Sequence, residues 1–270
     1  MAGPCYDSPM RLTLPLAALA LFATLALPAV ARAAAVAAVA DSGMLLLFEG
    51  PTVVAREEFR WTTEGDSVRV FAAHTRSFLD EAKVRQRFEK RMELVVDGRD
   101  FGLRSYTSNQ TFLDRTVVRG IVPEDTLFTY YSEVDGACSA IRLVRPPGRL
   151  YVLDSGMFTL FDVLCRSVAG REFRTRRVQT LALAPDTVTT PLVTLTQQSP
   201  DTVRVDGGRL VLRRYVFEDG TARFDLWADP EGRLRRLSHE ASGLRVERAA
   251  DAATAPPPTR KRTGTTKPKR

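Results

Sequence analysis

The residues able to supply acid–base chemistry are few, because the chain holds only two histidines, His74 and His239. Neither lies in a metal-ligand spacing such as His-Glu-x-x-His, and the sequence has no Gly-x-Ser-x-Gly nucleophile elbow. No phosphate-binding loop or dinucleotide fingerprint occurs either. We therefore expect no metal site, no cofactor and no catalytic residues.

A hydrolase built from Ser155, His239 and an acid is the enzymatic alternative, since catalytic residues can converge from distant parts of a chain. The Ser238-His239-Glu240 run does not form such a site by itself, because adjacent strand residues point to opposite faces. An enzyme would show His74 or His239 in a cleft beside a carboxylate. Glu57 and Glu58 also adjoin in one strand, so we expect a solvated charged face there and no carboxylate pair for sugar chemistry.

The net charge of +7 comes from the two ends of the chain. Residues 1–33 carry one net positive charge, and the segment after Asp251 carries six, which leaves the body of the chain neutral. The charge therefore does not indicate a nucleic-acid binder. Trp61 and Trp227 lie inside patterned strands, so we expect packing anchors there and no base-stacking platform.

The N-terminal segment has the features of a secretory signal peptide. Arg11 precedes the apolar run 12–30, and Ala31-Arg32-Ala33 offers a small-residue cleavage site. The alternative is an uncleaved N-terminal anchor, because about 19 apolar residues just span a bilayer. We expect cleavage after Ala33, a periplasmic or secreted protein, and no transmembrane helix in the mature chain.

The C-terminal segment, residues 251–270, is basic and proline-rich, so we expect disorder there. It either binds an anionic envelope surface or serves as a solubilising extension. Its cations are Arg260, Lys261, Arg262, Lys267, Lys269 and Arg270.

After export two cysteines remain, Cys138 and Cys165. An oxidising compartment would permit a disulfide between them, closing a loop of about 27 residues. Two buried free thiols are the alternative.

One helix and many strands are expected in residues 34–250, which we treat as a single domain. Apolar residues recur at helical spacing over about 156–169, where Ser155 or Thr159 can cap the start and Gly170 the end. On both sides, alternating Val-, Thr- and Phe-rich runs are divided by Asp-Gly and Gly-Gly turns, which is typical of antiparallel strands. The run 78–88 is ambiguous between a short helix and a strand connection. A large single-faced sheet with one helix to cover it predicts a mainly β fold: a strongly curved antiparallel sheet, an open half-barrel, around the central helix.

Three stretches carry a resemblance to a known group of proteins: "GMLLLFEGPTVVAREEFRW", "GMFTLFDVLCRSVAG" and "DGTARFDLWADPEGRLRRLSHEASGLRVER". They resemble exported bacterial half-barrel proteins of uncharacterised function, whose architecture is similar to that of the periplasmic lipoprotein carriers. The likeness covers most of residues 43–248, and its motifs are turn and packing features.

The resemblance implies an apolar concavity able to hold acyl chains or another hydrophobic ligand. The alternative for the residues expected to line it is that they simply fill the core. These residues are Phe158, Leu160, Phe161, Leu164, Phe224 and Leu226.

We therefore expect an exported, non-enzymatic binder or carrier of a hydrophobic envelope molecule, a lipid or a lipoprotein acyl chain. The first alternative is a structural or interaction protein of the cell envelope with a self-filled core. The second is a hydrolase with an unrecognised site.

Overall fold

The structure, a computed structural model, describes residues 38–113, 115–184, 187–205 and 208–249. The predicted signal peptide (1–33) and basic tail (251–270) lie outside the described residues. Within the described ranges the elements are β1 (Ala38–Glu49), β2 (Thr52–Glu64), β3 (Ser67–Leu79), β4 (Arg85–Asp97), β5 (Leu103–Phe112), β6 (Arg115–Pro123), β7 (Leu127–Val134), β8 (Ala137–Val144), β9 (Leu150–Asp154), α1 (Thr159–Val168), β10 (Thr175–Leu183), β11 (Val188–Thr189), β12 (Leu192–Val205), β13 (Gly208–Glu218), β14 (Arg223–Ala228), β15 (Leu234–His239), the short 3₁₀ helix η1 (Glu240–Ser242) and β16 (Leu244–Arg248).

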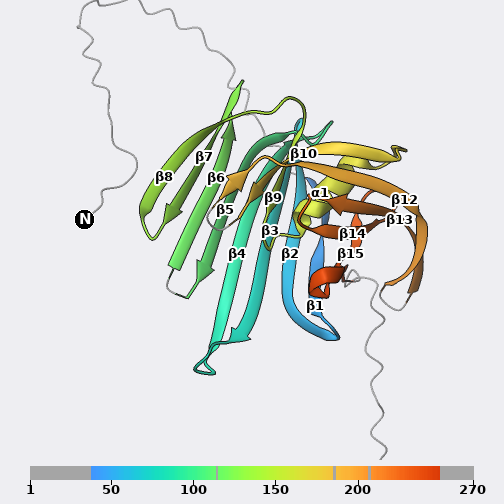
Figure 1. The fold of residues 1–270 in the computed structure, drawn as a ribbon, viewed down its shortest axis with the longest axis horizontal. Coiled ribbons are helices and arrows are strands. Elements are labelled where there is room, and N and C mark those ends of the chain that lie inside the picture. The colour runs from blue at the N-terminus through green and yellow to red at the C-terminus, as the bar shows by residue number, and fades with distance from the viewer. Residues whose placement is uncertain (1–37, 114, 185–186, 206–207, 250–270) are drawn as a thin grey trace, which may run out of the picture.

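The described strands form one curved sheet. Its order is β11-β10-β12-β13-β14-β15-β16-β1-β2-β3-β4-β5-β6-β7-β8, with β9 added in parallel to β10. The pairing of β1 with β16 joins the two halves of the chain. Edge strands β8 and β11 do not pair with each other, so the sheet stays open (Figure 1). The predicted half-barrel around one helix is confirmed.

The ambiguous run 78–88 is a strand connection and not a helix. Strand β3 extends to Leu79, a turn follows, and β4 begins at Arg85. Asp80 closes this turn by accepting a hydrogen bond from the backbone N–H of Val84 at 2.8 Å. The charged residues between the strands therefore form a hairpin tip, where they stay in water.

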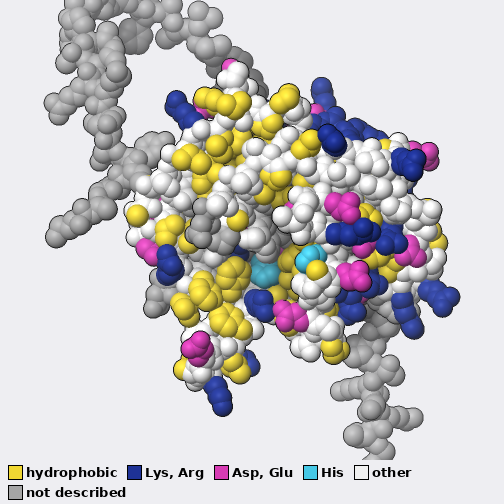
Figure 2. All heavy atoms as spheres, in the orientation of Figure 1, with side chains coloured by type: hydrophobic (Ala, Val, Ile, Leu, Met, Phe, Trp, Pro, Cys, Tyr) yellow, Lys and Arg dark blue, Asp and Glu magenta, His cyan; other side chains and the backbone are white. Residues whose placement is uncertain are grey.

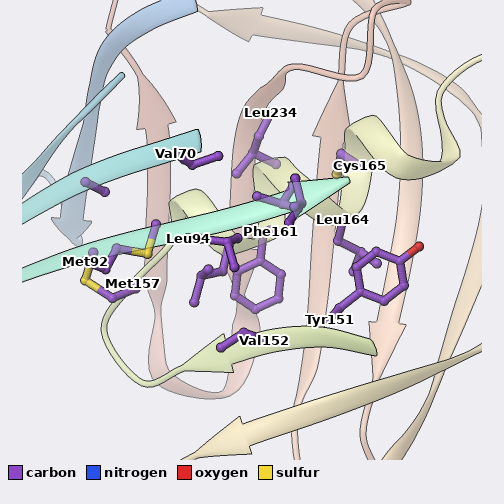
Figure 3. Close-up of a cluster of buried hydrophobic side chains, with 14 of the residues drawn as sticks. Val70, Met92, Leu94, Tyr151, Val152, Met157, Phe161, Leu164, Cys165 and Leu234 are labelled. Carbon is purple, nitrogen blue, oxygen red and sulfur yellow. The ribbon is translucent and has the colours of Figure 1, made fainter. Parts of the chain in front are cut away.

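Helix α1 lies inside the curve of the sheet and fills much of it. Each of its residues except Arg166 is buried. Figure 3 shows Phe161, Leu164 and Cys165 of the helix among Leu94 of β4, Tyr151 and Val152 of β9 and Leu234 of β15. Because the helix is buried on almost every side, it needs walls on several sides, and a half-barrel supplies them.

The predicted disulfide between Cys138 and Cys165 is not formed. Cys165 is a free thiol buried in α1, and burial raises its pKa well above the usual value. Cys138 lies on the exposed strand β8. Cys165 is enclosed by the core, whereas Cys138 is exposed on an edge strand of the sheet.

A buried charge network fixes the helix to the two strands that join the halves of the sheet. Asp41 of β1 accepts hydrogen bonds from Arg166 of α1 and from Arg248 of β16, the latter at 2.6 Å. Burial opposes ionisation of Asp41, but the two guanidinium groups hold its pKa below the usual value. Asp162 of α1 accepts from the backbone N–H of Leu234 at 2.6 Å, so the helix is also anchored to β15.

The turn between β14 and β15 touches the end of the helix at Gly232. A Cβ built there would lie 2.8 Å from the Cα of Arg166 and 2.8 Å from the Cβ of Ala169. Gly232 also has a positive φ of 82°. Gly220, in the preceding turn, has a similar φ of 88° but open space around it.

We expect Gly232→Ala to destabilise the fold more than Gly220→Ala. Both substitutions incur the left-handed backbone penalty, about 1 kcal/mol, whereas only Gly232→Ala pushes against the helix, at about 1–3 kcal/mol more. Urea unfolding followed by circular dichroism measures both. Equal losses of unfolding free energy would contradict the close packing of this turn on α1.

Candidate functional site

An apolar pocket of about 710 Å³ opens at the end of the half-barrel where α1 begins. Its walls come from the ends of β1–β5, from the segment before the helix and from the η1–β16 region; Phe78, Phe88, Phe112, Phe158, Leu47 and Leu244 supply the apolar surface. Phe78 and Phe112 stack with ring centroids 5.7 Å apart. Figure 2 shows hydrophobic side chains and histidines around a hollow on this face.

The strand register places side chains on the inner face of the sheet in transverse rows. One row, here called the polar row, crosses β2 to β5 as Glu57, His74, Lys90 and Gln110, each paired with the next. The neighbouring row toward the solvent is Ala55, Arg76, Phe88 and Phe112, all of which line the pocket. On the other side lie Phe59, Ala72, Met92 and Ser108, which are buried. The polar row thus separates the packed core from the pocket.

Glu57 caps helix α1 from a different strand. The residue at the N-cap position is Phe158, which offers no side-chain cap. Instead Glu57 Oε2 accepts from the backbone N–H of Phe158 at 2.9 Å, and Oε1 accepts from the N–H and the hydroxyl of Thr159 at 2.7 and 2.5 Å. A carboxylate is well placed there, because helix N-terminal N–H groups carry partial positive charge. The expectation of a solvated face is therefore wrong for Glu57, which is fully buried, and right for Glu58, which is exposed.

Lys90 fixes the segment that leads into the helix. Its Nζ donates to Asp154 Oδ1 at 2.5 Å and to the carbonyl of Ser155 at 2.9 Å. Asp154 Oδ2 accepts further hydrogen bonds from Tyr106 at 2.5 Å and Ser108 at 3.1 Å. Burial lowers the pKa of Lys90, and the charge of Asp154 opposes this shift.

His74 stands between this framework and the pocket. Its side chain is 5% exposed, and its Nδ1 lies 3.6 Å from Glu57 Oε2 without a hydrogen-bond partner in the described part of the chain. Its ring packs against Phe88 and Phe158, with centroids 5.8 and 6.4 Å away. His74 lines the pocket, and Nε2 is the ring nitrogen that does not face Glu57.

The structure divides the six residues predicted to line a cavity. Phe158 lines the pocket, and Phe224 is half-buried and stacked on His239, with centroids 4.7 Å apart. The other four fill the core, as the alternative interpretation holds: Leu160, Phe161, Leu164 and Leu226 are at most 8% exposed. Trp61 and Trp227 are buried as expected.

The structure places two residues of the hydrolase hypothesis, Ser155 and His74, in the lining of the pocket, and His239 outside it. Ser155 lines the pocket, but within the described ranges no hydrogen bond joins it to either histidine. His239 instead bonds Ser242 at 2.7 Å. His74 lies beside the buried carboxylate of Glu57, but that carboxylate already accepts hydrogen bonds from the start of helix α1.

Sequence reasoning missed the wall phenylalanines and the polar row. One signal was present: His74, Arg76 and Phe78 alternate along a strand and so share a face. The partners across the sheet depend on the register of four strands, which no local pattern specifies.

The described residues hold neither a group of three metal-ligating side chains close enough to bind an ion nor a helix long and apolar enough to cross a membrane.

Fold and pocket together define an open, β-barrel-like protein with an apolar end pocket. Among solved structures the chain is similar to the beta-barrel-like protein of the domain of unknown function DUF1849 from Brucella abortus. The TM-score is 0.50 at 8% sequence identity, over 78% of this chain and 97% of that one. Neither a protein-family model nor a curated protein sequence matches the chain. The likeness shows the fold alone.

We expect Lys90→Met to destabilise the protein by about 3–5 kcal/mol, because it leaves the buried carboxylate of Asp154 without its closest cation. The double variant Lys90→Met/Asp154→Asn should unfold at a higher urea concentration than Lys90→Met alone, since a neutral amide needs no counter-charge. A double variant that is less stable than the single one would contradict this account.

Proposed function

We propose that this protein binds or carries a hydrophobic molecule of the cell envelope, taking an acyl chain into the end pocket. The observation that carries the proposal is the pocket itself: about 710 Å³, walled by four phenylalanines and open at one end of the half-barrel. Small-molecule sites in proteins typically measure about 300–1,000 Å³ and combine apolar walls with a few polar groups. The signal-like N-terminal sequence supports an envelope location.

The walls fit a chain-like apolar ligand better than a polar one. Phe78, Phe88 and Phe112 come from three neighbouring strands of the sheet, and Phe158 comes from the segment before α1, so apolar rings line the pocket from both parts of the fold. Arg76 and Glu49 pair at the rim at 3.0 Å, which leaves the charged groups at the solvent edge. An acyl chain gains free energy by leaving water for such walls.

The core beneath the pocket favours the alternative of a structural envelope protein in one respect. Where helix α1 packs on β4, β5 and β9, the space beside Leu160 and Val163 is about 10 Å³. The helix therefore leaves little room for a ligand at that place. We therefore expect any ligand to bind in the end pocket. If the pocket binds nothing, the alternative of a structural envelope protein is favoured.

We expect Phe112→Asp to abolish binding of an acyl chain while the fold persists. Phe112 is half-buried on the pocket wall, so a carboxylate there repels an apolar ligand without removing core volume. Val211→Asp is the matched control, because Val211 is 68% exposed on β13, outside the pocket. Native mass spectrometry and lipid extraction of protein purified without detergent measure the bound species.

The acyl-carrying interpretation predicts a co-purifying lipid in the wild type and in Val211→Asp, lost in Phe112→Asp, with circular dichroism showing that both variants are folded. A wild-type protein with no bound lipid and no uptake of added dodecanoic acid would exclude the proposal and favour the scaffold.

A further inference from the structure

The floor of the pocket is polar although its walls are apolar. The polar row faces the pocket through His74 and Gln110, while Phe88 and Phe112 lie one row nearer the solvent. A ligand that enters with its hydrocarbon end first would bring that end against buried polar groups. A ligand that enters with its polar end first would place that end against the polar floor and its hydrocarbon chain against the apolar walls.

The charged members of the polar row, Glu57 and Lys90, are fully buried and already engaged. Glu57 accepts three hydrogen bonds from Phe158 and Thr159, and Lys90 is held by Asp154 and the carbonyl of Ser155. His74 differs from them. It is 4% exposed and lines the pocket, and its Nδ1 is buried without a hydrogen-bond partner among the described residues. Because the ring is held in the pocket wall, a ligand group that bonds its other nitrogen, Nε2, gains a hydrogen bond in a partly desolvated place.

Glu57 determines which chemistry the ring can offer. Glu57 Oε2 lies 3.6 Å from Nδ1, so a carboxylate faces that side of the ring and Nε2 is the nitrogen left for a ligand. A neutral ring accepts a hydrogen bond at Nε2, and a protonated ring donates one. A carboxyl group fits both states: a carboxylic acid donates its O–H to Nε2, or its proton moves to Nε2 and the imidazolium donates to the carboxylate. Charge-assisted bonds of this kind are stronger than those of a hydroxyl or an ester.

We propose that the pocket binds a long-chain aliphatic carboxylic acid with its carboxyl group inward on His74 and its chain along the phenylalanine walls. This inference rests on the proposed function and adds to it the head group and its orientation. The alternative cation is Arg76, two residues along the same strand, whose side chain is 47% exposed at the rim. A carboxylate held there would point outward.

The test compares dodecanoic acid with methyl dodecanoate as competitors for a neutral fluorescent probe, N-phenylnaphthylamine, in the delipidated full chain. We expect the acid to bind about tenfold more tightly than the ester, the effect of one charge-assisted hydrogen bond. In His74→Phe the two affinities should become equal while the ester still binds. In Arg76→Gln and in the histidine control His239→Gln the preference should persist.

A second measurement on the unmutated protein covers the case in which His74→Phe does not fold. The chain has two histidines, so a ¹⁵N-histidine spectrum holds two rings, which His239→Gln assigns. Dodecanoic acid should shift the Nε2 resonance of His74 and leave His239 in place, whereas the ester should shift neither.

Equal affinities of acid and ester in the wild type would overturn the carboxyl assignment and leave the proposed function standing. A preference lost in Arg76→Gln and retained in His74→Phe would overturn the inward orientation. Failure of both competitors to bind would overturn this inference and the proposed function together.

Discussion

The position of helix α1 depends on how its N-terminus is satisfied inside the curve of the sheet. The first turn of any helix leaves N–H groups unsatisfied, and burying them without partners costs several kcal/mol. Here the partner is Glu57, from a strand about a hundred residues earlier, whose carboxylate takes the N–H groups of Phe158 and Thr159. This contact fixes where the helix starts and, with it, how deep the packed core extends.

The same contact requires a second buried charge pair nearby. Glu57 and Asp154 both place negative charge in the interior, and Lys90, two strands from Glu57 in the same row, is bonded to Asp154. Buried charges are tolerated when they are paired and their remaining bonds are made, and Tyr106 and Ser108 complete those of Asp154. At the other end of the helix Arg166 and Arg248 do the same for Asp41. The helix is thus held at both ends by charge and along its length by apolar packing.

The pocket is a consequence of this anchoring. The sheet extends beyond the start of the helix, so the outer row of Ala55, Arg76, Phe88 and Phe112 has no helix to cover it. Apolar side chains left uncovered in a concave surface are typical of a ligand site. The fold alone does not assign a function, because similar barrel-like sheets are filled or empty according to their side chains.

The sequence by itself determined the fold class, the central helix and most turns, because each depends on local patterns: apolar residues at helical spacing over about 156–169, where α1 spans Thr159–Val168, alternation in the strands, and Gly at the turns. It also indicated correctly that Trp61 and Trp227 are packing residues. The sequence prediction failed for Glu57. The alternation of residues along a strand shows which of them face inward, but not that one of these meets the N-terminus of a helix. It failed for the cysteine pair as well, since Cys165 is enclosed by the core while Cys138 is on an outer strand.

Only the tertiary structure decided where the helix starts on the sheet, and hence that Leu160, Phe161, Leu164 and Leu226 are core while Phe88 and Phe112 face a pocket. The physical reason is that burial of an inward side chain depends on what lies opposite it. In a curved sheet, the residue that lies opposite an inward side chain is set by the register of strands distant in sequence.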